Sequence, residues 1–251
     1  MEMKPEYYSH IRDYVEACLP EFHQIRISKL ENLDLMDVLK RKNPYLFKVK
    51  NISTANEFIE TILNAYLSSQ EETLFGGFLE GLAIYLCETA FNGKKSASEG
   101  IDLEFENDSI RYIVSIKSGP NWGNSSQIKK MKDNFRRAKR ILGTNRRETQ
   151  RVVAVNGCCY GRDSSPEKDE YLKLCGQRFW EFVSGYPTLY VDIIEPLGHE
   201  AKKKNEEFML EYSKVVNRFS KDFLDKFCDD QGNIRWDAVV KYNSSIEKFV
   251  P

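Results

Sequence analysis

Long apolar runs are scarce in this chain of 251 residues. No segment approaches the roughly 18 consecutive apolar residues of a membrane span, and the opening MEMKPEYY lacks the apolar stretch of a signal peptide. We therefore expect a cytoplasmic protein that makes no membrane contact. The length allows one large α/β domain with a substantial core, or at most two small ones, and we favour one.

Histidine is also scarce, and cysteine shows no ligand spacing. The three histidines, at positions 10, 23 and 199, are not spaced as metal ligands and none lies beside a plausible nucleophile. No CxxC pair occurs, and every cysteine lies in or beside an apolar stretch, so we predict reduced core residues. They are Cys18, Cys87, Cys158, Cys159, Cys175 and Cys228. Zinc sites and catalytic triads are therefore disfavoured.

The net charge is only −1, which argues against a uniformly basic surface. One window departs from this balance, because ten basic residues oppose only Asp133 and Glu148 between positions 129 and 151. A solvated helix face is the usual explanation of such a run, but its place directly after the hairpin described below favours phosphate binding. The basic residues are Lys129, Lys130, Lys132, Arg136, Arg137, Lys139, Arg140, Arg146, Arg147 and Arg151.

Periodicity, capping boxes and turn signals predict the order of the elements. We expect helices near 6–18 and 23–40, a connector at 43–52, a helix that starts at the capping box 54–57 and another from the capping box 69–72 to about 91. A hairpin over 99–119 follows, then helix 125–142, strand 151–156, helix 168–184, strand 188–194 and helices near 200–227 and 236–249.

This order predicts the α/β class, with a mixed β-sheet sandwiched by helices and with helical N- and C-terminal additions. We expect a single domain over 1–251. Its parts would be a helical segment at 1–68, an α/β core at 69–195 and a second helical segment at 196–251.

The hairpin brings a carboxylate and a lysine together. Two runs of alternating apolar and polar residues flank an Asn-Asp-Ser turn. Because side chains alternate along a strand, Asp102 and Glu104 share one face, as do Ser115 and Lys117. A loop of three to four residues would set Asp102 opposite Val114 or Ser115, with Lys117 roughly 7–8 Å away between Cα atoms.

A carboxylate and a lysine in this arrangement suit the hydrolysis of a phosphodiester. Asp102 would bind a hard cation such as Mg²⁺, with the backbone carbonyl of Ile116 as a further ligand. Lys117 would orient or deprotonate the attacking water and stabilise negative charge. A cross-strand ion pair on a solvated face would use the same residue types. However, the next loop is rich in groups that contact nucleic acid.

A magnesium site generally takes more than one carboxylate, and Glu80 on the preceding helix is the best second donor. It shares a ridge with small or apolar residues such as Gly76 and Ala83, so we expect it to point inward. Gly76, Gly77 and Gly81 each weaken this helix by roughly 1 kcal/mol relative to alanine. A close approach to the sheet or substrate would compensate, although ordinary helix packing explains the pattern equally well.

Gly100-Ile101-Asp102 followed by Ser115-Ile116-Lys117 resembles the PD-(D/E)XK nuclease signature, and more specifically that of type II restriction endonucleases. The similarity runs from LFGGFLE at 74–80 through residue 118 to VVAVNG at 152–157, and extends to segments 177–182 and 230–236. The short motif is weakly specific by itself, but the succession of helix, hairpin and basic helix strengthens it.

The sequence departs from this signature in two places. Glycine and isoleucine replace the proline before Asp102, and Ser115 stands where the second acid is usual. The resemblance implies that Glu80, or less favourably Asp133, supplies the missing carboxylate. Glu104 is a third candidate, since it shares the face of Asp102 but lies roughly 6–7 Å nearer the turn.

The resemblance implies a restriction-endonuclease-like fold and Mg²⁺-dependent, site-specific hydrolysis of double-stranded DNA. The catalytic residues would be Asp102, Lys117, Glu80 and Ser115, and the metal ligands Asp102, Glu80 and the Ile116 carbonyl. A homodimer would place one active site on each strand, and a cognate DNA methyltransferase would be encoded nearby. The alternatives are a repair or structure-specific nuclease of the same fold, or a DNA-binding protein with an inactive site.

The residues after the hairpin are candidates for DNA contact. The loop would present amide and indole groups to bases, the start of the next helix would face phosphate, and a loop at 157–165 would offer an arginine to guanine. A capped turn with a buried indole is the alternative for this loop. The predicted contacts are Asn121, Trp122, Asn124, Ser125, Ser126, Lys129, Lys130, Arg136, Arg137 and Arg162.

Overall fold

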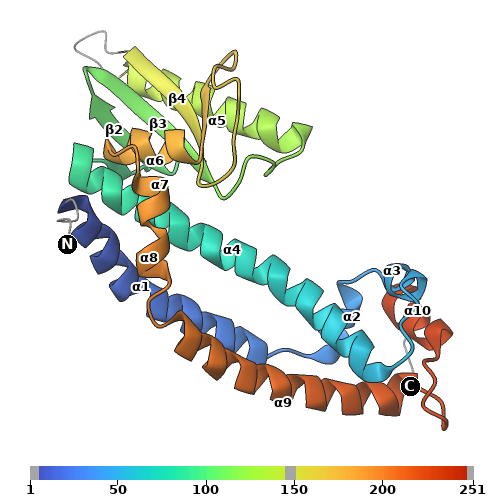
Figure 1. Ribbon diagram of the computed structural model, residues 1–251. Coiled ribbons are helices and arrows are strands. Elements are labelled where there is room, and N and C mark those ends of the chain that lie inside the picture. The colour runs from blue at the N-terminus through green and yellow to red at the C-terminus, as the bar shows by residue number, and fades with distance from the viewer. Residues whose placement is uncertain (1–5, 145–150, 248–251) are drawn as a thin grey trace. The chain divides into compact units, whose positions relative to one another are not determined.

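The computed structural model describes residues 6–144 and 151–247 (Figure 1). Arg146, Arg147 and Glu148 of the basic window lie outside the described residues. The chain divides into two compact units. The sheet unit consists of the described residues of Met1–Pro20 and Leu74–His199, and the helical unit of those of Glu21–Thr73 and Glu200–Pro251. The predicted three-part division follows chain order, whereas each unit combines two separate stretches of chain.

A five-stranded mixed sheet organises the sheet unit, with strand order β1-β2-β3-β4-β5. Strands β1 (Lys94–Lys95), β2 (Leu103–Asn107) and β3 (Ile110–Lys117) pair antiparallel. Strands β4 (Arg151–Cys158) and β5 (Leu172–Cys175) continue the sheet in parallel with β3. Helix α5 (Ser125–Thr144) connects β3 to β4, as a parallel crossover requires. The predicted mixed sheet with flanking helices is confirmed.

The hairpin turn is tighter than expected. Asp108 and Ser109 both have positive φ, 50° and 61°, as in the two-residue turns that match the twist of a hairpin. Leu103 pairs with Val114, and the N–H of Asp102 donates to the Val114 carbonyl at 2.8 Å. Asp102 therefore lies level with Ser115, which is one of the two predicted registers.

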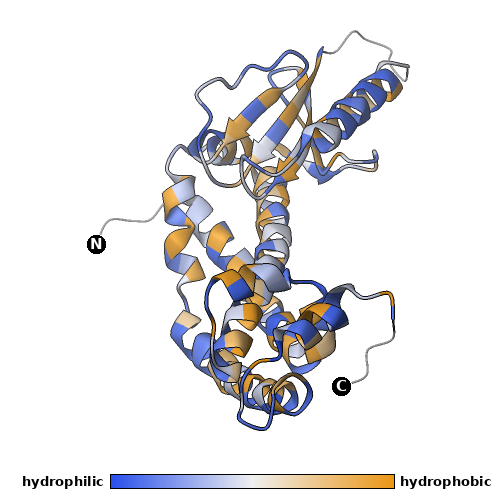
Figure 2. Ribbon diagram, turned by 90° about the vertical axis from the view of Figure 1, so that its right-hand side faces the viewer, coloured by the Kyte–Doolittle hydropathy of each residue, from blue (hydrophilic) through white to orange (hydrophobic). Residues whose placement is uncertain are grey.

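The two faces of the sheet are covered by different helices, because side chains alternate along each strand. On one face Ile113 and Ala154 join an apolar cluster with Phe135 of α5. On the other, Phe105 contacts Phe91 and Phe182, with ring centroids 5.4 and 5.1 Å apart. Those rings belong to α4 (Ala55–Phe91) and α6 (Gln177–Ser184). Figure 2 shows the resulting apolar bands on the strands and on α5.

Two helices are longer than the sequence predicts. Helix α1 (Glu6–Glu31) continues through Pro20, where we expected a break, and α4 runs without interruption from Ala55 to Phe91. The cap at Thr54 is confirmed, since its hydroxyl accepts the N–H of Glu57 at 3.2 Å. The second capping box is wrong, because the Ser69 hydroxyl donates to the Ala65 carbonyl inside the helix.

By length and composition alone, α4 is apolar enough to cross a membrane, contrary to the expectation from the sequence. Phe58 and Ile62 of this helix are buried in the core of the helical unit, and Leu82 and Ala83 are buried in the sheet unit. Of its most apolar window 28% is buried, so core packing accounts for part of the apolar composition of α4.

The helical unit combines parts of α1 and α4 with four further helices of the described residues, and its core includes the stacked rings of Phe58 and Phe223, with centroids 4.6 Å apart. These helices are α2 (Leu35–Lys40), α3 (Pro44–Val49), α9 (Ala201–Phe227) and α10 (Trp236–Ser244). Helix α3 occupies the predicted connector, where the Asn43 side chain caps it by accepting the N–H of Tyr45 at 3.0 Å. Helix α9 matches the first predicted charged helix. Helix α10 begins where the second was predicted but ends at Ser244, short of the predicted 249, and residues 248–249 lie outside the described residues.

Two expectations between residues 168 and 194 are wrong. Strand β5 and helix α6 replace the single helix, because Gly176, with φ 54°, separates them. Helices α7 (Leu189–Asp192) and α8 (Ile194–Leu197) replace the predicted strand. Leu189 and Ile193 are buried four residues apart while Val191 is exposed, which is helical rather than strand spacing.

Candidate active site

The structure brings Asp102 and Lys117 together where β2 begins and β3 ends. Lys117 Nζ lies 3.7 Å from Asp102 Oδ2. The same oxygen accepts the backbone N–H of Ile116 at 2.6 Å and the hydroxyl of Ser115 at 3.4 Å. Both charged side chains are partly exposed, with 31% of Lys117 and 22% of Asp102 accessible. The carboxylate is thus oriented by β3 and still open to a ligand.

Lys117 is held by two further contacts. Its ammonium donates to the Ile116 carbonyl at 2.7 Å and lies 5.5 Å from the centroid of the Trp122 ring, within cation–π range. The Trp122 indole in turn donates to Asn156 Oδ1 at 3.1 Å. Because it rests on the indole, the ammonium stays at the end of β3.

Asn156 is a residue that sequence reasoning did not single out. It is 1% exposed and lies level with Ser115 on the neighbouring strand. Its Nδ2 donates to the Ser115 carbonyl at 3.2 Å, while its Oδ1 accepts from Trp122. It therefore ties β3, β4 and the loop together beneath the site. The available signal was an asparagine at the end of the otherwise apolar run VVAV.

Glu80 faces the same site from α4. Its side chain is half-buried, and burial raises the pKa of its carboxyl. The negative charge of Asp102 raises it further, while the positive charges of Lys117 and Lys95 oppose the shift. This influence of both charges agrees with the expectation that Glu80 points inward, and its role at the site stays a prediction.

The glycines of α4 permit the close approach that the sequence suggests. A Cβ at Gly76 would lie 2.4 Å from the Ser118 hydroxyl oxygen, and one at Gly81 would lie 2.1 Å from the phenol oxygen of Tyr14. Gly77 has no atom within 4 Å of the equivalent position. Gly76 therefore lets α4 lie against the end of β3, where Glu80 can reach the site.

The other two candidate carboxylates are engaged elsewhere. Glu104 is 6% exposed and accepts hydrogen bonds from Arg111, at 2.7 Å, and from Ser96. Burial alone would raise the pKa of Glu104, but these hydrogen bonds outweigh it and lower the pKa. Asp133 pairs with Arg136 at 2.8 Å on α5. Of the three, Glu80 is the one whose pKa responds to both Asp102 and Lys117.

A metal ion would find two carboxylates here, with the carbonyl of Ile116 beside them. Within residues 6–144 and 151–247 no group of three or more His, Cys, Asp or Glu side chains is arranged to hold a metal. The donor set consists of hard oxygen atoms and no soft ligand, which suits Mg²⁺ and not zinc. The half-buried Glu80 and the nearby Asp102 repel each other when both are ionised, and a bound cation would relieve that repulsion.

The loop after β3 is partly structural. Trp122 packs against the apolar cluster beneath α5, which partly bears out the alternative of a buried indole. Asn124 and Gln127 form a reciprocal cap, in which each side-chain oxygen accepts the backbone N–H of the other, at 2.9 and 3.0 Å. Asn121, Ser125 and the other exposed residues at this end of α5 leave their side chains accessible: Ser126, Lys129 and Lys130.

The remaining predicted DNA contacts differ in their present partners. Arg136 forms a two-pronged pair with Glu170, at 2.6 Å for both nitrogens, and Arg137 pairs with Glu99 at 2.6 Å. Arg162 is exposed in the loop that follows β4. Their roles in binding DNA stay predictions.

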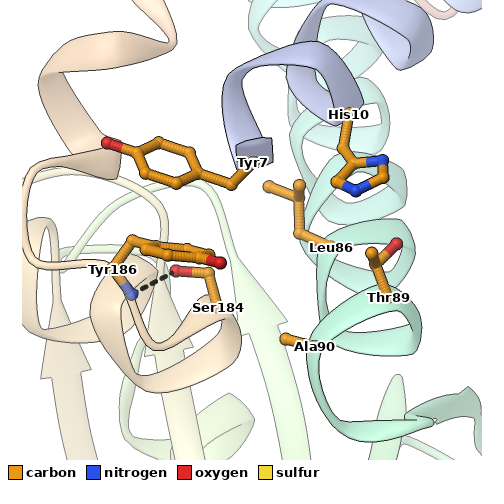
Figure 3. A pocket seen from close by; sticks show the side chains of 7 residues that line it. All are labelled: Tyr7, His10, Leu86, Thr89, Ala90, Ser184 and Tyr186. Carbon is orange, nitrogen blue, oxygen red and sulfur yellow. Dashed lines mark hydrogen bonds between the residues drawn. The ribbon is translucent and has the colours of Figure 1, made fainter. Parts of the chain in front are cut away.

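A small cavity elsewhere in the sheet unit is separate from this site. Its volume is about 190 Å³, and the rings of Tyr7 and Tyr186 stack beside it with centroids 3.9 Å apart (Figure 3). The phenol of Tyr7 donates to Asp192 at 2.6 Å, which ties α1 to α7. Neither Asp102, Glu80 nor Lys117 is among the residues that line it: Tyr7, His10, Leu86, Thr89, Ala90, Ser184 and Tyr186.

Comparison with known proteins gives one family. The family model described as type II restriction endonuclease EcoO109I matches residues 9–205. No curated protein matches the chain. The matched span includes Glu80, Asp102, Ser115 and Lys117.

Proposed function

The chain belongs to the EcoO109I family of type II restriction endonucleases, which are site-specific deoxyribonucleases, and from this premise we propose that it is a Mg²⁺-dependent enzyme. Its substrate would be double-stranded DNA with a defined recognition sequence. The observation that carries the proposal is the convergence of Asp102, Lys117 and Glu80 at the end of β3.

The proposed metal ligands are Asp102, Glu80 and the Ile116 carbonyl. Mg²⁺ usually keeps several waters and takes one or two carboxylates plus phosphate oxygens, so two acids suffice. The carbonyl now accepts a hydrogen bond from Lys117, which the lysine would give up on metal binding. When bound, the cation would neutralise charge on the phosphate and lower the pKa of a water.

Lys117 would orient the attacking water and stabilise the charge that develops on the phosphate. Its ammonium is close to Asp102 and rests on the Trp122 ring, so little side-chain freedom is lost when substrate binds. Ser115 replaces the usual second acid, and the hydrogen bond from its hydroxyl to Asp102 supports a positioning role. Glu80 would supply the missing negative charge.

For DNA binding we propose the exposed residues at the start of α5, together with Arg162. Asn121 and Ser125 lie beside Lys129 and Lys130, whose ammonium groups are available for phosphates. Trp122 and Asn124 would contribute mainly by shaping the loop, given their contacts with Asn156 and Gln127. Arg136 and Arg137 would have to exchange Glu170 and Glu99 for phosphate.

Each chain carries one such site, and double-strand cleavage needs one site per strand. We therefore propose a homodimer acting on a two-fold symmetric DNA sequence. A cognate DNA methyltransferase, encoded nearby, would protect the host's own copies of that sequence.

The test is digestion of plasmid and phage DNA by the purified protein with Mg²⁺, resolved on a gel. We expect discrete fragments that disappear with EDTA, with Asp102→Asn and with Lys117→Ala. The matched controls are Asp108→Asn, in the turn at the opposite end of the hairpin, and Lys94→Ala, exposed on β1. Both controls should cut like the unmodified protein. A smear would indicate an unspecific nuclease, and intact DNA with a retained gel shift would indicate a binding protein.

A further inference from the structure

A second, larger cavity of the sheet unit lies beyond the end of β4. Its volume is about 630 Å³, and its walls come from the loop after β4, the start of α6 and helix α7. The side chains of Arg162 and Arg178 line it, together with the rings of Tyr160 and Tyr190. Tyr160 is 53% exposed and Tyr190 44%. Their exposed rings offer flat apolar surfaces with a polar hydroxyl group beside the two guanidinium groups.

The backbone of this cavity is tightly packed. A Cβ at Gly161 would lie 2.6 Å from the Pro120 ring, and one at Gly176 would lie 2.6 Å from the Gly161 carbonyl oxygen. The Trp180 indole also donates to the Cys159 carbonyl at 2.8 Å. The loop therefore has no room to collapse into the cavity, which is formed before any ligand binds.

The charge of the cavity is positive. Its one acid, Asp163, is neutralised by Lys168 at 3.3 Å and Lys173 at 3.6 Å. Arg178 donates only a long hydrogen bond, 3.4 Å, to the Asp163 carbonyl. Among the described residues, neither Arg162 nor Arg178 forms an ion pair with a carboxylate. Two guanidinium groups are therefore free to bind an anion, and guanidinium matches phosphate geometry well.

The cavity begins next to the candidate active site. The Lys117 carbonyl accepts the N–H of Cys159 at 2.9 Å, and the Ser118 carbonyl accepts the N–H of Tyr160 at 3.0 Å. The wall of the cavity is thus one strand spacing, about 4.8 Å, from the backbone of the lysine. A DNA strand whose phosphate lies at Lys117 would have its next nucleotide within reach of this wall.

We propose that this cavity is a subsite for one nucleotide of the cleaved strand, adjacent to the scissile phosphate. Arg162 and Arg178 bind its phosphate, and Tyr160 and Tyr190 pack against its sugar and base. Stacking of a base on a ring requires that base to leave the duplex, at a cost of a few kcal/mol, and then tolerates any base, whereas arginine can also read guanine. The inference rests on the proposed function, and it adds Arg178, Tyr160 and Tyr190 to the DNA-binding residues.

The test measures DNA binding separately from cleavage. Fluorescence anisotropy would measure the affinity of the protein for a labelled DNA duplex, with Ca²⁺ in place of Mg²⁺. The duplex carries the cleavage site, which is mapped by sequencing the cut ends. If no cut is found, a duplex of mixed sequence is used. We expect Arg178→Gln to weaken binding about tenfold and to lower the salt slope by about 1. Tyr190→Leu should weaken binding about tenfold without changing the salt slope. Arg12→Gln, an exposed arginine of α1 that pairs with Glu16 on the same helix, is the matched control.

A methylphosphonate scan identifies the phosphate. Neutralising one phosphate beside the cut should weaken binding of the unmodified protein about tenfold but leave binding of Arg178→Gln unchanged, since the contact is already lost. Additive losses at every position would overturn the subsite, as would variants that bind like the Arg12→Gln control. Failure of the unmodified protein to cut DNA would instead count against the proposed function, while the binding comparison would still decide the subsite.

Discussion

Replacing Glu80 with glutamine should have opposite effects on activity and on stability. The substitution keeps the shape of the side chain and removes one negative charge from the site shared with Asp102. If Glu80 is the second metal-binding acid, cleavage should fall. If its ionisation is also opposed by burial and by the Asp102 charge, the metal-free protein should become more stable.

The loss of activity can be estimated from electrostatics. A unit charge pair about 4 Å apart contributes ~4 kcal/mol at an effective dielectric of about 20. Glu80 is half-buried, and glutamine keeps an oxygen that can still face the metal. We therefore expect the substitution to raise the activation free energy of cleavage by about 2.7 kcal/mol, which corresponds to roughly a hundredfold slower cleavage at limiting Mg²⁺. A higher Mg²⁺ concentration should restore part of the cleavage rate, because the substitution weakens the affinity of the site for the cation.

The gain in stability follows from the direction of the pKa shift. In the folded protein the pKa of Glu80 is raised, so folding favours the protonated form. The resulting penalty is absent below the unfolded pKa of about 4.3, grows as pH rises through the folded pKa, and is complete above it. Without metal, Glu80→Gln should melt at a higher temperature than the unmodified protein at pH 8, with the difference vanishing near pH 4.

The assay combines plasmid cleavage over a Mg²⁺ titration with thermal melts in EDTA at several pH values. Asp133→Asn is the matched control, since that acid pairs with Arg136 on α5 and should change cleavage little. The reasoning is refuted if Glu80→Gln cuts within about threefold of the unmodified protein at every Mg²⁺ concentration, a change of only ~0.7 kcal/mol. It is also refuted if the variant is less stable than the unmodified protein at pH 8.

Three further predictions concern neighbouring residues. Glu104→Gln should destabilise the protein by about 2–3 kcal/mol in denaturant unfolding, because it removes the closer of the two carboxylates that pair with the partly buried Arg111. A cleavage defect with unchanged stability would make Glu104 the second acid instead. Gly77→Ala should stabilise α4 by about 0.5–1 kcal/mol, whereas Gly76→Ala should destabilise it through the clash with Ser118. Adding Ser118→Ala to Gly76→Ala should restore the lost stability. If the two alanine variants change stability equally, α4 does not pack closely against Ser118. Trp122→Ala should slow cleavage about tenfold, because Lys117 loses its contact with the ring. Trp122→Phe keeps an aromatic ring and should retain more activity in the same gel assay. Equal cleavage rates for both variants would show that the ring does not hold the lysine.

Local chemistry was enough to predict the hairpin and its catalytic face. A period of two in the apolar pattern decides which side chains share a face, so Asp102, Ser115 and Lys117 were brought together before any tertiary information was used. The inward direction of Glu80 followed likewise from the small and apolar residues on its ridge. These features depend on spacing within one element or between adjacent strands.

Other features depended on contacts between segments far apart in the chain. The residues around Ser69 read as a helix start, but α4 has buried apolar side chains on both sides of them, and this burial overrides the capping signal. Residues 188–194 read as a strand because they are rich in branched and aromatic side chains. Burial of Leu189 and Ile193 in the sheet unit selects a helix instead.

The sequence by itself determined the nuclease-like motif, the mixed sheet and the three candidates for the second acid of the site. Only the tertiary structure distinguishes those acids, because Glu104 pairs with Arg111 of the neighbouring strand and Asp133 with Arg136 of its own helix, while the charge of Asp102 raises the pKa of Glu80. The sequence pattern likewise did not predict the role of Asn156 or the cavity beside Arg178, because each depends on which strand lies next to β3 or β4. The periodicity of the sequence predicts on which face of a strand or helix a side chain lies. Which residues that face contacts depends on how the elements pack in the folded protein.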